Sequence, residues 1–138
     1  MLLNKTKHVE TLGKAIYVDA PMFVANSNGI KCLYYMGLEL SRRGLDVKLS
    51  PRTLVNFFNN LPADIAGLPL GNIENMTNRD ILFCSESVPP KKIKHARNIG
   101  AKIIWWYLAP HGLLERSKVE PIAGEQICCF SSYVLPDL

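Results

Sequence analysis

The chain has 138 residues, of which 48% are apolar and 20% are charged. This composition is typical of a globular domain and not of a disordered chain. One domain of this length can bury a single hydrophobic core. The net charge of +4 is compatible with an anionic ligand. Nucleic-acid binding is not expected, because it would call for a concentrated basic face.

The cysteines and histidines predict neither a disulfide framework nor a metal site. The four cysteines form no C-x-x-C pair, and the three histidines show no metal-ligand spacing. We therefore expect free thiols in a reducing compartment and no bound metal or cofactor. The polar lead-in, residues 1–13, lacks the apolar core of an export signal, and no apolar run approaches the ~20 residues of a membrane helix. A cytoplasmic protein without a transmembrane segment is expected.

The first secondary-structure elements predict a βαβ unit. Residues 14–19 are almost all apolar, as in a strand that is covered by helices on both faces. A helix is predicted over residues 30–43, following Ser27 or Asn28 as its N-cap, with Gly44 at its C-terminal end. A second short strand is predicted over residues 46–50.

The next stretch, residues 51–79, is rich in asparagine, proline and glycine and reads as a long irregular insertion. Within it, residues 53–60 predict a helix with Leu54, Phe57 and Phe58 facing inward. A loop of this length in a compact domain tends to be functional or mobile.

The second half of the chain continues the alternation of strands and helices. Strands are predicted over residues 80–84, 102–108 and 126–130, and a helix over residues 91–99 that ends at Gly100. Such alternation is typical of a parallel sheet with right-handed crossovers. We therefore expect an α/β fold, in which the whole chain forms a three-layer Rossmann-like sandwich with a mostly parallel sheet of about five strands.

The turn before the first helix contains the first candidate binding residues: Asn26, Ser27, Asn28 and Gly29. Backbone N–H groups at a helix N-terminus, together with amide and hydroxyl side chains, can bind a phosphate or sugar hydroxyls. The alternative is an ordinary capped helix start. The turn lacks the glycine pattern of a dinucleotide site and the Gly-Lys-Ser/Thr of a P-loop, so NAD or ATP binding of those kinds is not expected.

Two further candidates follow predicted strands at the same edge of the sheet. Glu86 comes after the third strand and can accept hydrogen bonds from ligand hydroxyls, or can simply stabilise the start of the next helix. His111 follows the fourth strand and is a weak candidate catalytic residue, because a histidine titrates near neutral pH and can move a proton. A loop histidine without a role is the alternative.

A basic cluster and an aromatic run admit both a functional and a structural interpretation. Residues 91–97 contain three lysines, a histidine and an arginine, which could contact phosphates of RNA or lipid but are typical of the solvated face of an amphipathic helix. Residues 105–107, Trp-Trp-Tyr, could stack on a ligand but lie in an apolar strand, which favours core packing.

Two stretches of the chain together resemble the N-terminal domain of GT-B glycosyltransferases. The first reads Asn26-Ser-Asn-Gly-Ile-Lys31, followed by Leu38-Glu-Leu-Ser-Arg-Arg-Gly-Leu-Asp-Val47. The second reads Asp80-Ile-Leu-Phe-Cys-Ser-Glu86, followed by a helix and Ile103-Ile-Trp-Trp-Tyr-Leu-Ala-Pro-His-Gly112. The resemblance covers residues 14–133. Similar sequence stretches occur in enzymes that act on cell-surface polysaccharides.

The resemblance implies a half-site on a Rossmann-like domain. In this family, two such domains face each other across a cleft, the first holding the glycan acceptor and the second the nucleotide-sugar. The turn with residues 25–29 would approach the donor phosphates, and the loop with His111 would face the acceptor. Because 138 residues cannot hold both domains, we expect this transferase-like chain to supply the acceptor- and phosphate-binding half of a carbohydrate-transfer site, with the donor domain on a partner chain. The alternative is a non-catalytic homodimeric module, in which an apolar patch near residues 130–138 covers an exposed sheet edge.

Overall fold

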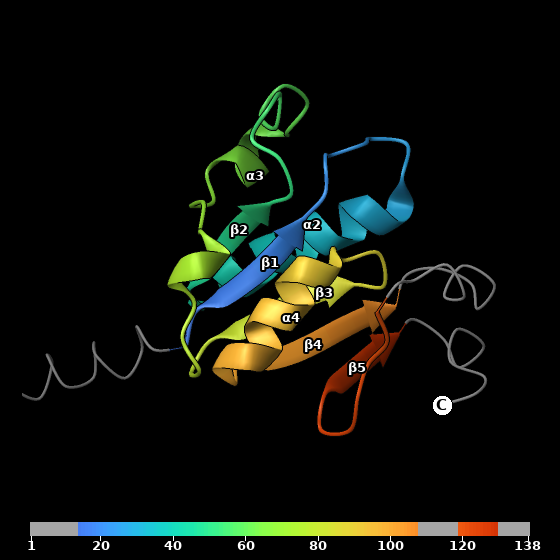
Figure 1. Cartoon of the computed structure of the whole chain (residues 1–138). Helices are drawn as coiled ribbons and strands as arrows, with labels where there is room; N and C mark the ends of the chain where they lie inside the picture. The colour runs from blue at the N-terminus through green and yellow to red at the C-terminus, as the bar shows by residue number, and fades with distance from the viewer. Residues whose placement is uncertain (1–13, 108–118, 130–138) are drawn as a thin grey trace, which may run out of the picture.

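The computed structural model describes residues 14–107 and 119–129, which form a parallel five-stranded sheet with helices on both faces (Figure 1). The strands lie in the order β2-β1-β3-β4-β5. They are β1 (Ile16–Ala20), β2 (Val47–Pro51), β3 (Ile81–Ser85), β4 (Lys102–Tyr107) and β5 (Gln126–Cys129). Within the described residues, each predicted strand is found within two residues of its expected bounds. The expected three-layer, Rossmann-like α/β sandwich is confirmed.

Helix α2 (Asn28–Arg42) joins β1 to β2 and covers one face of the sheet. Its N-cap is Ser27, whose hydroxyl accepts a hydrogen bond from the backbone N–H of Ile30 at 3.2 Å. After Arg43, the chain leaves the helix through Gly44, whose φ of +92° is a left-handed conformation that glycine adopts without strain. The core on this face contains the following buried residues: Val18, Leu33, Tyr34, Leu38, Leu49, Phe57, Phe83 and Trp106.

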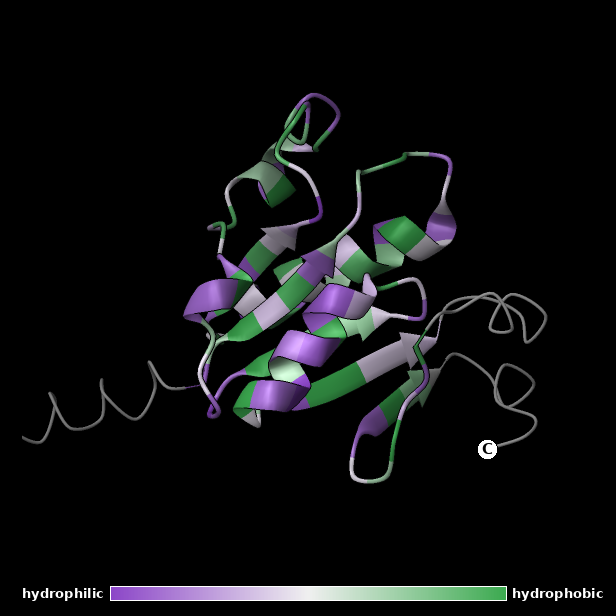
Figure 2. Cartoon of the chain, in the orientation of Figure 1, coloured by the Kyte–Doolittle hydropathy of each residue, from purple (hydrophilic) through white to green (hydrophobic). Residues whose placement is uncertain are grey.

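Helix α4 (Pro90–Ile99) joins β3 to β4 and covers the opposite face. It begins at a proline, which the first turn of a helix tolerates, and it ends at Gly100 in the left-handed conformation. Figure 2 shows the polar residues of α4 on its outer side and apolar residues along the strands beneath it. The core on this face contains the following buried residues: Tyr17, Met76, Leu82, Cys84, Ile93, Ile103, Trp105 and Tyr107. The aromatic run at residues 105–107 is therefore core, as expected.

The predicted helix over residues 53–60 is wrong, because this segment forms turns. Asn56 has a φ of +57°, which interrupts a right-handed helix, and the Thr53 hydroxyl accepts the Val55 N–H and so competes with helical bonding. Only Phe57 points inward, whereas Leu54 is 67% exposed and Phe58 is 51% exposed.

The rest of the insertion carries two short helical segments and closes over the edge strand β2. These segments are α3 (Ala63–Ala66) and the 3-10 helix η1 (Ile73–Asn75). Between them, Leu49 of β2 donates its N–H to Pro69 O and accepts the N–H of Gly71, each at 2.8 Å. This backbone pairing brings Gly71 so close to the sheet that a Cβ there would lie 2.8 Å from Lys48 Cβ and from Tyr17 Cε2. Among residues 14–107 and 119–129, no helix has the length and apolarity that crossing a bilayer requires.

We predict that Gly71→Ala lowers the free energy of unfolding by about 1–3 kcal/mol, because the added methyl group overlaps the backbone-proximal atoms of β2. Gly67→Ala is the matched control, since its Cβ would lie 3.6 Å from the nearest atom and its φ of −77° suits alanine. Urea unfolding followed by circular dichroism measures both changes. Equal stability of the two variants would contradict the close approach at Gly71.

Candidate functional site

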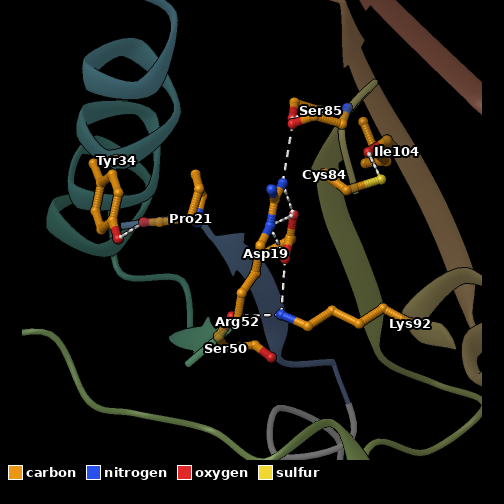
Figure 3. Close-up of polar contacts among 10 residues, drawn as sticks. Asp19, Pro21, Tyr34, Ser50, Arg52, Cys84, Ser85, Lys92 and Ile104 are labelled. Carbon is orange, nitrogen blue, oxygen red and sulfur yellow. Dashed lines mark hydrogen bonds and ion pairs between the residues drawn. The ribbon is translucent and has the colours of Figure 1, made fainter. Parts of the chain in front are cut away.

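The candidate site is built around Asp19, a fully buried aspartate at the carboxyl end of β1. Two cations contact its carboxylate: Arg52 Nη2 lies 2.7 Å from Oδ2 and Lys92 Nζ lies 2.8 Å from Oδ1. Arg52 Nε also donates to both carboxylate oxygens, at 3.3 and 3.2 Å. Figure 3 shows the two cations reaching Asp19 from different sides. We call Asp19, Arg52 and Lys92 the Asp19 triad.

Parallel strand ends bring the triad together from distant parts of the sequence. Asp19 pairs in register with Ser50 of β2, and Arg52 follows two residues later, so its guanidinium returns to the end of β1. Lys92 lies in the first turn of α4, after β3, and its ammonium also donates to the backbone oxygen of Ser50 at 2.6 Å. Arg52 Nη2 donates in addition to the hydroxyl of Ser87, in the turn that precedes α4, at 3.0 Å. The triad therefore joins β1, β2 and α4 at the carboxyl edge of the sheet.

The triad carries more positive than negative charge. One carboxylate faces two cations, so a unit of positive charge is left over. The side chain of Lys92 is only 11% exposed, and this burial lowers its pKa, although the charge and the hydrogen bond of Asp19 act in the opposite direction. A buried cation with this surplus favours a bound anion, because an anion would complete its neutralisation.

A pocket of about 380 Å³ opens beside the triad. Its walls come from the end of β2, from the segment that crosses the β2 edge, and from α4. They are formed by Ser50, Pro51, Leu54, Leu70, Gly71, Asn72, Ile73 and Lys92. Lys92 thus belongs both to the triad and to the pocket wall, and this volume lies in the range of small-molecule sites.

The predicted phosphate turn lies at the same edge of the sheet but does not line this pocket. Asn26 and Asn28 are exposed, Ser27 and Gly29 are partly buried, and the Ser27 hydroxyl serves as the N-cap of α2. None of these four residues belongs to the pocket wall. They lie at the start of the helix that covers the other face of the sheet, so the edge presents two separate surfaces.

Glu86 follows β3 and is partly buried. Its charge acts on Tyr107 of β4: burial raises the pKa of Tyr107 to about 12, and the negative charge of Glu86 adds to that effect. Glu86 is not part of the pocket wall.

Two further predictions lie outside the described residues. They concern His111, the candidate catalytic residue, and residues 130–138, the expected dimer patch.

The basic cluster at residues 91–97 is only partly a solvated face. Lys91 and Lys94 are exposed, whereas Lys92 belongs to the Asp19 triad. Arg97 forms an ion pair with Glu125 at 2.9 Å, and Glu125 also accepts a hydrogen bond from Trp105 Nε1 at 3.0 Å. Burial raises the pKa of Glu125, but hydrogen bonds from Arg97, the backbone and Trp105 outweigh this, so the pKa lies below its usual value. This second ion pair fastens α4 to the segment before β5.

Neither a nucleophilic role for Cys84 nor a metal site finds support in the described part of the chain. Cys84 is fully buried in β3, and burial raises the pKa of its thiol, so it stays protonated and is a poor nucleophile. Over residues 14–107 and 119–129, no three His, Cys, Asp or Glu side chains are grouped so that they could hold a metal ion.

The sequence pattern did not single out Arg52 for binding, and it considered Lys92 only as one member of the basic cluster at residues 91–97. A signal was present, because an aspartate that ends an apolar strand is expected to be buried and to need cationic partners. Arg52 follows the neighbouring strand and Lys92 opens the next helix, both at the same edge. The sequence does not distinguish Lys92 from the other basic residues of α4.

No family model matches the chain, and no curated protein or solved structure does so either. The fold and the Asp19 triad are therefore the observations on which a function can be argued.

We predict that Asp19→Asn lowers the free energy of unfolding by about 3–5 kcal/mol, because it leaves two cations at a buried site without their counter-ion. Glu39→Gln is the control: it removes one partner of an exposed ion pair with Arg43, and its effect should stay within about 0.5 kcal/mol. Urea unfolding measures both. A loss below about 1 kcal/mol for Asp19→Asn would mean that the triad adds little to stability.

Tyr34 of α2 also responds to the charge of Asp19, and it supplies a test by pH. Its hydroxyl donates to the backbone oxygen of Pro21, and its pKa is raised well above 10.0, first by burial and then by the nearby Asp19 charge. The folded protein therefore keeps this proton at a pH where the unfolded chain releases it. The stability that Tyr34 contributes is present below about pH 10 and is lost as the pH rises further.

We predict that Tyr34→Phe makes stability fall less steeply than in the wild type from about pH 9 to about pH 11. The lowered pKa of Lys92 makes stability rise with pH, because the unfolded chain binds more protons than the folded protein at the pH where Lys92 titrates. This contribution is the same in the variant and the wild type, so it cancels in the comparison. Urea unfolding at several pH values measures the two slopes. Identical slopes would show that Tyr34 titrates alike in the folded and unfolded chains.

Proposed function

We propose that the described domain supplies the acceptor- and phosphate-binding half of a nucleotide-sugar-dependent glycosyl-transfer site. The observation that carries this proposal is the turn with residues 26–29, which opens α2 after β1 at the carboxyl edge of a Rossmann-like sheet. In open α/β sheets, ligands bind outside the carboxyl ends of the strands. Phosphate groups are the anionic part of a nucleotide-sugar, and the resemblance to GT-B glycosyltransferases supplies this choice of ligand.

The arrangement of the edge supports the proposal in a second way. The turn with residues 26–29 follows β1 and the turn with Glu86 follows β3, and these two strands are hydrogen-bonded neighbours. Backbone N–H groups in the first turn suit phosphate oxygens, and a carboxylate in the second suits sugar hydroxyls. In this proposal the described domain binds and orients ligands, and the chemical step also requires a donor-binding domain.

We predict that UDP-glucose, UDP-N-acetylglucosamine or GDP-mannose shifts the amide NMR signals of residues 26–30 in a saturable way. Asn26→Ala should weaken this binding about fivefold through loss of a hydrogen bond to the ligand. Asn98→Ala, an exposed asparagine near the end of α4, is the matched control and should bind like the wild type. Unchanged signals of this turn across nucleotide-sugars and glycan acceptors would reject the proposal.

A homodimeric interaction module is the second candidate, favoured by exposed apolar residues after β2. One short segment exposes three large apolar side chains: Leu54 at 67%, Val55 at 70% and Phe58 at 51%. Exposed apolar side chains that gather in this way are typical of surfaces that bind another protein.

We predict for this candidate a dimer in light scattering that Val55→Asp together with Phe58→Asp converts to a monomer, because the charges cannot be buried at an interface. Leu45→Asp, an exposed leucine outside this segment, is the control and should leave the dimer intact. A wild-type protein that is monomeric at every concentration would exclude the dimer.

A further inference from the structure

The pocket beside the Asp19 triad is lined by residues of two kinds. Four of them have apolar side chains: Pro51, Leu54, Leu70 and Ile73. Three have polar or charged side chains: Ser50, Asn72 and Lys92. Such a lining suits a ligand that has both a polar group and an apolar body.

Lys92 is the charged group of the pocket, and it has bonding capacity left for a ligand. An ammonium carries three N–H donors. Among the described residues, Asp19 Oδ1 and Ser50 O accept two hydrogen bonds from Lys92 Nζ, at 2.8 and 2.6 Å. Because Lys92 also lines the pocket, its third donor can serve a group bound there.

The charge of the triad decides the sign of that group. Asp19 is shared with Arg52, which approaches to 2.7 Å, so the single carboxylate does not neutralise both cations. Arg52 is absent from the pocket wall, which leaves Lys92 as the cation that faces a ligand. An oxyanion at this position would gain a charge-assisted hydrogen bond in a partly desolvated site.

We infer that this pocket binds a small amphipathic anion, whose carboxylate or phosphate head contacts Lys92 and whose apolar body packs against Leu54, Leu70 and Ile73. The site differs in place and in ligand chemistry from the turn with residues 26–29, so the inference goes beyond glycosyl transfer. Arg52 acts here as a positioning residue, since it holds Asp19 and does not line the pocket.

The first experiment titrates the full chain with hexyl phosphate, hexanoate, inorganic phosphate and 1-hexanol, followed by amide NMR. Hexyl phosphate or hexanoate should shift residues 70–73 in a saturable way, with a dissociation constant of about 0.1–1 mM. Inorganic phosphate and 1-hexanol should each bind at least about tenfold more weakly, since each lacks one half of the ligand. The comparison of the two amphipathic probes tells a phosphate site from a carboxylate site.

Variants at Leu54 test the site without touching the buried triad. Leu54 is 67% exposed, so glutamine and glutamate there should both leave the fold intact. Leu54→Glu should bind the amphipathic anions about fivefold more weakly than Leu54→Gln, because its carboxylate competes for Lys92. Leu45→Glu, at an exposed leucine outside the pocket, is the matched control and should bind like the wild type.

Three results would overturn the inference: no saturable shift at residues 70–73 with either amphipathic anion, equal binding of inorganic phosphate and hexyl phosphate, or equal binding by Leu54→Glu and Leu54→Gln. The outcome is separable from that of the proposed function. Hexyl phosphate that shifts residues 70–73 while nucleotide-sugars leave residues 26–30 unchanged would support this pocket and reject glycosyl transfer. Nucleotide-sugars that shift residues 26–30 while the amphipathic anions leave residues 70–73 unchanged would support glycosyl transfer and reject this pocket.

Discussion

A carboxylate that is entirely removed from water is the constraint on which this structure depends. Asp19, the residue before the end of β1, has no exposed surface, and the desolvation of an unpaired carboxylate would cost several kcal/mol. The fold meets that cost with Arg52 and Lys92, which come from the end of β2 and the start of α4. Because these partners are far apart in sequence, the ion pairs fix how β1, β2 and α4 meet.

The same constraint prepares the site for a ligand. Lys92 reaches inward from α4 to contact Asp19, so its side chain is largely withdrawn from solvent, and Lys92 also lines the pocket. The backbone bonds that hold Gly71 against β2 build the other side of that pocket. Groups held in this way are preorganised, so a ligand would not pay to order them. Stability and binding therefore draw on the same contacts.

Local pattern was enough to predict the sheet and its two main helices, whereas the Asp19 triad needed long-range information. The apolar spacing of α2, its Ser27 cap and the glycines after α2 and α4 act within a few residues of the chain. The triad depends on the register between Asp19 and Ser50, which no local pattern encodes. The helix predicted after β2 failed for a local reason, because Thr53 and Asn56 adopt turn conformations that outweigh the apolar spacing.

The two faces of β1 explain why the carboxyl edge offers two surfaces. Successive side chains of a strand point to opposite faces, so Val18 and Ala20 pack under α2 while Tyr17 and Asp19 face α4. The turn that opens α2 therefore lies over one face, and the pocket with Lys92 lies over the other. The charge of Asp19 is nevertheless felt at Tyr34 of α2, where it helps to raise the pKa of the phenol. One buried carboxylate thus acts on both faces, and an anion bound at Lys92 would change the electrostatic surroundings of both.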